Sequence, residues 1–164
     1  MNHRAAIALG SNLGNSHQIL EDALKTLAHH PQVSLEACSP IYQTPAIGPP
    51  QPDYLNCCAI VSTSLEPEPF LALLLSIETQ FGRERRERWG PRLLDLDLLL
   101  FDDLIIHLPG LQIPHPRMGD RAFVLVPLSD IAADWVDPVS GLAIVQLKHQ
   151  VDTSGIQPFH PLHS

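Results

Sequence analysis

The 164-residue sequence lacks several features that would indicate other classes of protein. No apolar run approaches the ~20 residues of a membrane-spanning helix, and the first residues lead into a strand-like stretch without the core of a secretory leader. The chain has 10 Lys and Arg against 18 Asp and Glu, and this net charge of -8 disfavours a long nucleic-acid backbone as a ligand. We therefore expect one cytoplasmic domain over residues 1–164, with neither a membrane nor a nucleic acid as a partner.

Cysteine is also scarce, because the chain contains only three cysteines, which cannot all pair. Two of them are adjacent within a strand-like segment. Neighbouring residues of a strand point to opposite faces, so Cys57 and Cys58 can form neither a disulfide framework nor a metal clamp. We expect these two and Cys38 to be reduced and packed in the interior.

The order of the expected elements predicts an α+β fold. We expect strands at residues 4–9, 33–42, 55–63 and 93–101, and helices at residues 19–27, at 67–82 and beyond Met118. The order β-α-β-β-α-β is typical of a ferredoxin-like α/β sandwich, with helices on one face of a mainly antiparallel sheet. The strand over 93–101 is nearly all apolar, which predicts a central strand covered on both faces. The tail after about residue 145 has weak periodicity, and we assign no element to it.

Two carboxylates interrupt this apolar strand. Because side chains at i and i+2 share a face, Asp95 and Asp97 point the same way, ~7 Å apart. Like charges held beside an apolar core repel each other unless a cation or arginines lie between them, and Mg²⁺ takes one or two carboxylates together with phosphate oxygens. A strand end that emerges into water is the alternative interpretation. The arginine-rich loop that precedes the strand favours the metal.

Five of the ten Lys and Arg residues lie in that loop. They are Arg83, Arg85, Arg86, Arg88 and Arg92. Phosphoryl transfer requires positioning and charge neutralisation, which guanidinium groups and Mg²⁺ provide. A solvated loop in which Glu84 and Glu87 pair internally is the simpler alternative, but the excess of arginine favours a short polyanion such as a nucleotide triphosphate.

A proline-rich segment over residues 44–53 joins two expected strands and is long for a hairpin. Its prolines restrict the backbone, which is typical of a loop that holds a ligand. Tyr54 and Asn56 follow on one face of the next strand, where an aromatic plane beside an amide suits a flat heterocycle. From these two residues alone, an ordinary strand surface is the more frequent explanation.

Three further features have no decisive interpretation from the residues alone. Phe123 and Trp89 have the character of core residues. His115 lies between two prolines and could contact a phosphate or end a turn. Gly10-Ser11-Asn12 lacks the ending of a Walker motif, so we interpret it as a strand-to-helix turn.

Several short motifs occur together over about residues 5–135. They are Leu9-Gly10-Ser11-Asn12-Leu13-Gly14, Tyr42-Gln43-Thr44-Pro45, Pro52-Asp53-Tyr54-Leu55-Asn56, Gly82-Arg83, Arg88-Trp89-Gly90-Pro91-Arg92, Leu94-Asp95-Leu96-Asp97 and Ile113-Pro114-His115-Pro116-Arg117-Met118. In this combination the chain resembles the 6-hydroxymethyl-7,8-dihydropterin pyrophosphokinase family. The resemblance implies a Mg²⁺-dependent monomer that transfers pyrophosphate from ATP to the hydroxymethyl-pterin and releases AMP, in folate biosynthesis.

The resemblance also implies roles for individual residues. Asp95 and Asp97 would hold two Mg²⁺ ions, while Arg83 and Arg92 would be catalytic and grip the ATP phosphates during transfer. Further ATP contacts would come from Glu78, Arg85, Trp89, Leu98, Gln112, His115 and Arg121. The pterin would lie between Tyr54 and Phe123, and its edges would be read by Asn56 and the backbone of Thr44, Pro45, Ala46 and Ile47.

The chain departs from the usual bacterial pattern at a few positions. Leu75, Gly110 and Pro116 stand where glutamine, a basic residue and tyrosine are usual near the nucleotide, and Ala46 replaces a second proline. Two other functions remain open. A noncatalytic nucleotide-sensing module would need the arginines but not both aspartates, and an Asp-x-Asp nucleotide-sugar transferase would usually need a longer chain.

Overall fold

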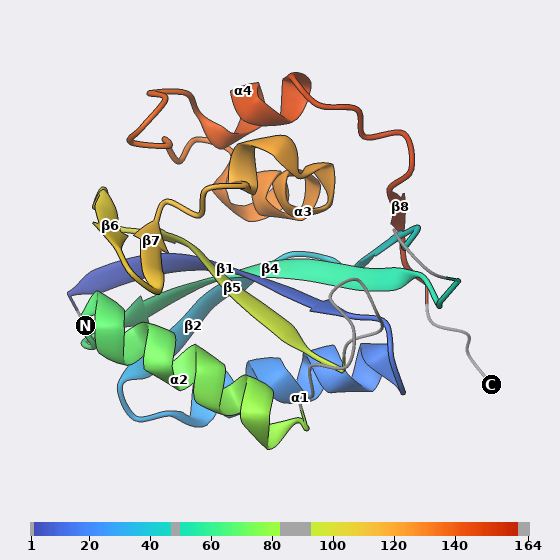
Figure 1. The fold of residues 1–164 in the computed structure, drawn as a ribbon, viewed down its shortest axis with the longest axis horizontal. Helices are drawn as coiled ribbons and strands as arrows, with labels where there is room; N and C mark the ends of the chain where they lie inside the picture. Colours follow the sequence, from blue (N-terminus) through green and yellow to red (C-terminus); the bar gives the residue numbers. More distant parts are fainter. Residues whose placement is uncertain (1, 47–49, 83–92, 161–164) are drawn as a thin grey trace.

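A six-stranded sheet forms the centre of the computed structural model, which describes residues 2–46, 50–82 and 93–160 (Figure 1). The strands are β1 His3–Ser11, β2 Val33–Cys38, β3 Tyr42–Thr44, β4 Tyr54–Thr63, β5 Asp95–Phe101 and β8 Gln157–Pro158. The order is β5-β1-β4-β3-β8, and β2 also pairs with β4. All these pairings are antiparallel. The α+β class and the mainly antiparallel sheet are therefore confirmed.

Helices cover both faces of this sheet, although they were expected on one face only (Figure 1). α1 (Ser16–His29) and α2 (Pro67–Gln80) pack on the first face and, with β5-β1-β4-β2, complete the ferredoxin-like core. α3 (Ala122–Ala132) packs on the second face, and α4 (Ile144–His149) packs on α3. A short 3-10 helix (Met118–Asp120) precedes α3, as the helical pattern beyond Met118 predicted in outline.

The two faces of the sheet bury two separate cores. Cys57 belongs to the core beneath α1 and α2, whereas Cys58 belongs to the core beneath α3. Burial raises the pKa of the Cys57 thiol to about 12 and raises that of Cys58 well above its ordinary value. Both cysteines are free and buried, as expected, but Cys38 is exposed, so the expectation of an interior position was wrong for Cys38.

The strand expected over residues 33–42 is divided in two. β2 ends at Cys38, and β3 begins at Tyr42. Pro40 lies between them and has no backbone N–H to donate to a neighbouring strand, which accounts for the break. The result is a separate short strand, β3, that leads directly into the proline-rich loop.

β5 lies at the edge of the described sheet, next to β1, and not in its centre as expected. Both of its faces are nevertheless covered, because Leu96 and Leu98 belong to the first core while Leu99 and Leu100 belong to the second. A register shift opposite Ala6 places Leu99 and Leu100 together on the second face. α2 and the small hairpin of β6 (Ile106–Leu108) and β7 (Leu111–Ile113) cover this strand. Its apolar composition therefore reflects burial and not a central position.

The chain after residue 145 has defined elements that its weak sequence pattern did not predict. α4 continues to His149, and β8 pairs with β3 at the sheet's other edge. Within the described ranges, the structure contains no helix that is both long and apolar enough to span a membrane.

Candidate active site

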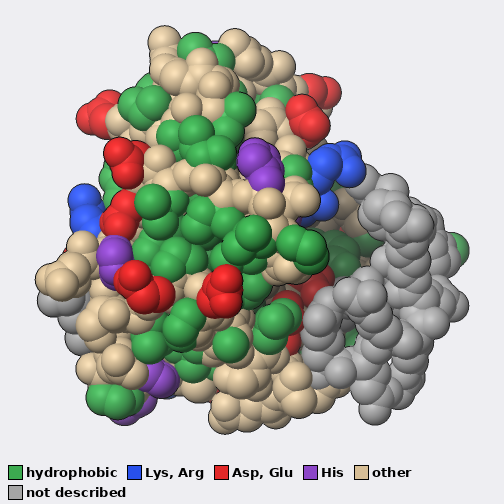
Figure 2. Space-filling view, turned by 60° about the vertical axis from the view of Figure 1, so that its left-hand side comes forward, with side chains coloured by type: hydrophobic (Ala, Val, Ile, Leu, Met, Phe, Trp, Pro, Cys, Tyr) green, Lys and Arg blue, Asp and Glu red, His purple; other side chains and the backbone are tan. Residues whose placement is uncertain are grey.

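Asp95 and Asp97 border two cavities at the start of β5. Their side chains lie on the face opposite Leu96, which is buried in the first core. One cavity, of about 480 Å³, is also lined by Tyr54, and we call it the Tyr54 cavity. The other, of about 380 Å³, is also lined by Gln112, and we call it the Gln112 cavity. Figure 2 shows acidic side chains inside a hollow of this side of the molecule. The two carboxylates thus lie between the two cavities.

The Tyr54 cavity brings together most of the residues that we expected to contact a pterin. Its lining includes Thr44, Pro45, Tyr54, Asn56 and Phe123. Tyr54 and Asn56 come from β4 and Phe123 comes from α3, so the sheet and the second helical layer supply different walls. Ala46 is not among the lining residues, and Ile47 lies outside the described residues.

The amide of Asn56 is held in one orientation. Its side chain is buried, and its Nδ2 donates to the Thr44 hydroxyl at 3.0 Å. Gly10 lies opposite Asn56 on β1, where an added Cβ would stand 2.9 Å from the Asn56 Oδ1. The missing side chain at Gly10 therefore leaves the space that the amide needs. This role was missed in the sequence, where Gly10 was interpreted only as part of a turn.

Asn12 connects the end of β1 to the proline-rich loop. It is buried, and its Nδ2 donates to the Gln51 Oε1 at 2.8 Å and to the Pro52 carbonyl at 2.9 Å. Asn15, in contrast, accepts from the backbone N–H of Gln18 and caps α1. The turn expected at Gly10-Ser11-Asn12 was placed too early, because β1 continues to Ser11 and the turn begins at Asn12. Asn12 also holds the loop that leads to Tyr54.

The Gln112 cavity brings together four of the residues expected to contact ATP. They are Glu78, Leu98, Gln112 and His115. The three positions that depart from the usual bacterial pattern, Leu75, Gly110 and Pro116, line the same cavity.

Glu78 extends from α2 to the edge of β5. It is buried, and its Oε2 accepts a hydrogen bond of 2.8 Å from the backbone N–H of Leu96. Because Leu96 separates Asp95 from Asp97, this bond fixes the backbone between the two carboxylates.

His115 follows β7 and is anchored to β5. Its backbone N–H donates to the Leu99 carbonyl at 2.9 Å, and its Nδ1 accepts from the backbone N–H of Arg117 at 3.1 Å. Burial lowers the pKa of the imidazole, and Arg121 and Arg117 lower it further, while Asp97 opposes them. The neutral ring is favoured, with its proton on Nε2.

Arg121 lies beside Asp97 in the lining of the Tyr54 cavity. Its Nη1 is 3.8 Å from the Asp97 Oδ2, and its guanidinium carbon is 5.6 Å from the centroid of the Phe123 ring. Arg121, which we expect to contact ATP, lines the Tyr54 cavity, and this position leaves that expectation untested. A positive charge therefore stands beside both the aromatic wall and a carboxylate.

The remaining expected site residues, Arg83, Arg85, Trp89 and Arg92, lie outside the described residues. Over residues 2–46, 50–82 and 93–160, no group of three or more His, Cys, Asp or Glu side chains is arranged to hold a metal ion. Among the described residues, Asp95 and Asp97 would therefore supply only part of the ligands of a bound metal ion.

The C-terminal segment contributes residues that sequence reasoning missed. Asp152, Gly155 and Ile156 line the Tyr54 cavity. No periodicity or motif distinguishes them, and only the path of the chain brings them to this place.

Comparison with known proteins identifies a family. The family model described as 7,8-dihydro-6-hydroxymethylpterin-pyrophosphokinase (HPPK) matches residues 6–133. A Synechocystis protein named 2-amino-4-hydroxy-6-hydroxymethyldihydropteridine pyrophosphokinase is 48% identical over 159 residues, which cover 97% of this chain and 82% of the relative. A Bacillus subtilis protein of the same name is 45% identical over 132 residues, or 80% of this chain and 79% of the relative.

Solved structures support the fold. A crystal structure of Plasmodium falciparum HPPK-DHPS matches 91% of this chain with a TM-score of 0.71 and 16% identity. This chain spans 43% of that longer chain. At this low identity, the likeness concerns the fold alone.

Proposed function

The chain belongs to the 7,8-dihydro-6-hydroxymethylpterin-pyrophosphokinase family, and on this premise we propose that it transfers pyrophosphate from ATP to 6-hydroxymethyl-7,8-dihydropterin. The products are the pterin diphosphate and AMP, and the reaction is a step of folate biosynthesis. One observation carries the proposal: Asp95 and Asp97 border both the Tyr54 cavity and the Gln112 cavity. Substrates bound in the two cavities would meet at these carboxylates.

The Tyr54 cavity suits the pterin. Tyr54 and Phe123 offer aromatic surface for a flat ring, which aromatic side chains contact favourably by stacking. The fixed amide of Asn56 offers a donor and an acceptor to the ring's polar edge, and the neighbouring backbone of residues 44–47 would read the same edge. The hydroxymethyl group would then point toward Asp95 and Asp97.

The Gln112 cavity suits the nucleotide. Leu98 offers apolar surface to the base, while Gln112 and His115 offer polar contacts. Arg83 and Arg92 would act on the transferring phosphates, with Arg85 and Trp89 as further ATP contacts, because guanidinium groups bind phosphate oxygens by paired hydrogen bonds. Transfer requires attack of the hydroxymethyl oxygen on the β-phosphorus and loss of AMP, so these contacts belong at the β-phosphate.

Two Mg²⁺ ions fit the acidic pair. Mg²⁺ is usually bound by one or two carboxylates, with phosphate oxygens and water completing its ligands, and the described part of the site offers this kind of incomplete set. Bound there, Mg²⁺ would neutralise phosphate charge. Glu78 holds the backbone between the two aspartates, and Arg121 adds positive charge beside Asp97.

The protein's size and fold support a simple organisation. Both cores share the same sheet, which supports one domain over residues 1–164. We expect this domain to act as a monomer in the cytoplasm.

The nucleotide product tests the proposed function. The purified protein is incubated with Mg²⁺, ATP and 6-hydroxymethyl-7,8-dihydropterin, and the nucleotides are separated by chromatography. AMP formed in step with the pterin diphosphate is the expected result. ADP would contradict a pyrophosphate transfer, and ATP binding without turnover would favour a nucleotide-sensing module.

A further inference from the structure

The C-terminal segment, residues 151–160, runs from the α3–α4 layer to the edge of the sheet and forms part of the Tyr54 cavity (Figure 1). Asp152, Gly155 and Ile156 line the cavity together with Pro45 and Phe123. The family model matches only residues 6–133. Asp152, Gly155 and Ile156 therefore lie beyond the residues that the family model matches.

The far end of the segment is fixed to the sheet. Gln157 pairs with Gln43 of β3, and the backbone N–H of Phe159 donates to the Ile41 carbonyl at 2.9 Å. The Phe159 side chain packs against the first core, with its ring centroid 5.5 Å from that of His17. Phe159 does not line the cavity, so its contacts hold the segment from outside.

The segment is also held internally where it passes the cavity. The backbone N–H of Ser154 donates to the Asp152 Oδ1 at 2.9 Å, and that of Ile156 donates to the Thr153 carbonyl at 3.1 Å. These short-range bonds form a compact turn. The wall therefore has a defined shape before any ligand binds.

Gly155 brings this turn against the proline-rich loop. A Cβ added at Gly155 would lie 3.6 Å from the Pro45 Cδ, which is ordinary van der Waals contact. Pro45 and Ile156 are both cavity residues, so the loop and the C-terminal segment form one continuous wall. This wall faces a space that Tyr54 and Phe123 also line.

We infer that residues 152–156 are part of the binding site for the pterin substrate and set its affinity. Ile156 supplies apolar surface that covers the bound ring, and Phe159 is the positioning residue that holds the wall against β3. Covering the ring removes apolar surface from water, which is the source of the added affinity. The inference rests on the proposed function, namely that the pterin occupies the Tyr54 cavity.

The test compares Ile156→Ala with a matched control, Ile105→Ala, because Ile105 is 52% exposed and lines neither cavity. Calorimetry measures pterin binding in the presence of Mg²⁺ and α,β-methylene-ATP, which cannot release AMP. We expect Ile156→Ala to raise the Kd for the pterin roughly fivefold, because it removes apolar contact area. The Kd for the ATP analogue and the melting temperature should match those of the control.

A second variant separates substrate binding from stability. Phe159→Ala should release the segment from β3 and raise the Kd for the pterin at least as much as Ile156→Ala does. In steady-state assays its pterin KM should rise, while kcat and the Kd for the ATP analogue change little. If Phe159→Ala had a lower melting temperature but normal pterin affinity, the segment would stabilise the fold without contributing to pterin binding. Unchanged pterin affinity in Ile156→Ala would likewise overturn the inference. If the wild-type protein released no AMP, the proposed function would fail, and that result is distinct from either of these.

Discussion

At the scale of single residues, the space at Gly10 controls the orientation of Asn56. The Asn56 amide is buried and held by Thr44, so it has little freedom to move away from a new side chain. An added Cβ at Gly10 would approach the Asn56 Oδ1 to 2.9 Å, closer than such atoms normally come. A single methyl group should therefore disturb the polar end of the Tyr54 cavity.

We predict that Gly10→Ala weakens pterin binding about tenfold, since it displaces a preorganised hydrogen-bonding group at a cost of about 1.4 kcal/mol. ATP binding should be preserved, because Gly10 does not line the Gln112 cavity. The matched control is Gly119→Ala, where the added Cβ would have no contact closer than 3.9 Å. Calorimetry with each ligand makes the comparison, and equal pterin affinity in the two variants would refute the role assigned to Gly10.

The acidic pair allows a second prediction at this scale. Asp97→Ala should abolish turnover and leave the protein at least as stable as the wild type, because the variant loses an expected metal ligand and also relieves repulsion between like charges. Activity is measured over a Mg²⁺ titration, and stability by thermal unfolding. Asp103→Ala serves as the control, because Asp103 is exposed and lines neither cavity. Near-normal activity of Asp97→Ala at any Mg²⁺ concentration would contradict the assignment of Asp97 as a metal ligand.

The sequence predicted features that depend on neighbouring positions in the chain. It missed residues whose role depends on contacts between segments that are distant in the sequence. The two-residue spacing of Asp95 and Asp97 was enough to place them on one face of a strand. The partnership of Gly10 with Asn56 depends on the register of β1 against β4, which no local pattern reveals. Ile156 lies far along the sequence from β3, the strand beside its segment, so only the folded chain identifies it.

At the scale of elements, β5 illustrates what composition can and cannot predict. Its run of leucines correctly indicated burial on both faces, but β5 is an edge strand of the described sheet. The apolar composition of a strand indicates that its faces are buried, but it does not indicate whether the strand has a neighbour on one edge or on both. α2 packs against β5, and Glu78 of that helix accepts the Leu96 N–H, which an edge strand would otherwise expose.

We predict that this contact positions the acidic pair. Glu78→Ala removes the acceptor of a buried N–H and should lower the free energy of unfolding by about 1–3 kcal/mol. The same change should raise the Mg²⁺ concentration needed for half-maximal activity, because the backbone between Asp95 and Asp97 is no longer fixed.

Glu78→Gln tests whether charge or geometry matters, since the amide oxygen can still accept from Leu96. Recovery of stability and of Mg²⁺ response in Glu78→Gln would support a positioning role. Loss of activity in Glu78→Gln with normal stability would instead indicate that the negative charge itself contacts the substrate or metal.

The C-terminal elements were missed because their stability is not local. β8 has two residues and, among the described strands, pairs with the three-residue β3 alone, so neither strand would be stable by itself. Contacts with the core through Phe159 supply the rest. Hydrophobic periodicity cannot detect an element that depends on such distant contacts.

At the scale of the whole molecule, the second helical layer follows from a pattern that was present in the sequence. β1 and β4 are apolar at consecutive positions, and residues on both faces of each are buried. Such runs are typical of strands that are covered on both sides. The β-α-β-β-α-β order accounted only for α1 and α2, so α3 and α4 are the elements that this second apolar face requires.

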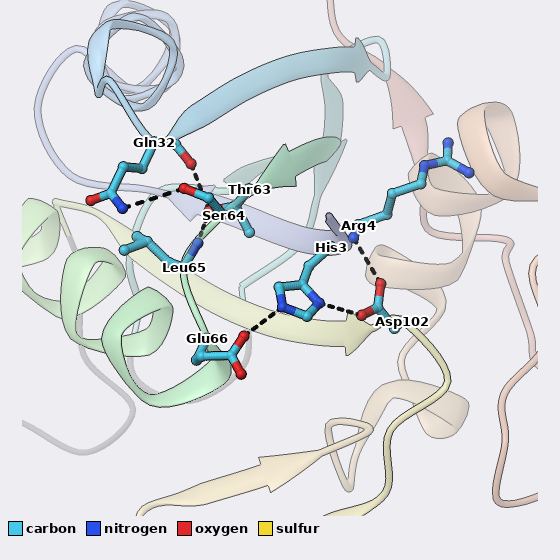
Figure 3. Close-up of polar contacts among 8 residues, drawn as sticks. All are labelled: His3, Arg4, Gln32, Thr63, Ser64, Leu65, Glu66 and Asp102. Atoms are coloured by element: carbon cyan, nitrogen blue, oxygen red, sulfur yellow. Dashed lines mark hydrogen bonds and ion pairs between the residues drawn. The ribbon is translucent and has the colours of Figure 1, made fainter. Parts of the chain in front are cut away.

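At the end of the sheet away from the cavities, the His3 side chain contacts two carboxylates and so links three elements; we call these contacts the His3 connection. His3 of β1 lies between Glu66, which precedes α2, and Asp102, which follows β5 (Figure 3). The His3 Nδ1 is 2.7 Å from the Asp102 Oδ2, and the backbone N–H of Arg4 donates to the other oxygen of Asp102 at 2.8 Å. The protonated ring can donate to both carboxylates at once.

We predict that this connection makes the protein's stability depend on pH near neutrality. The hydrogen bond to Asp102 raises the pKa of His3 above 6.5, partial burial opposes that rise, and Glu66 adds to it. Because the folded state favours the charged ring, the stabilisation is complete below the unfolded pKa and is lost as the pH rises through the higher folded pKa. Urea unfolding from about pH 6 to about pH 8 should show the free energy of unfolding of the wild type falling toward that of His3→Gln, which cannot titrate. All other residues are the same in the two proteins, so the difference between the two curves isolates the contribution of His3. A difference that stays constant across this range would mean that the connection makes no contribution linked to protonation.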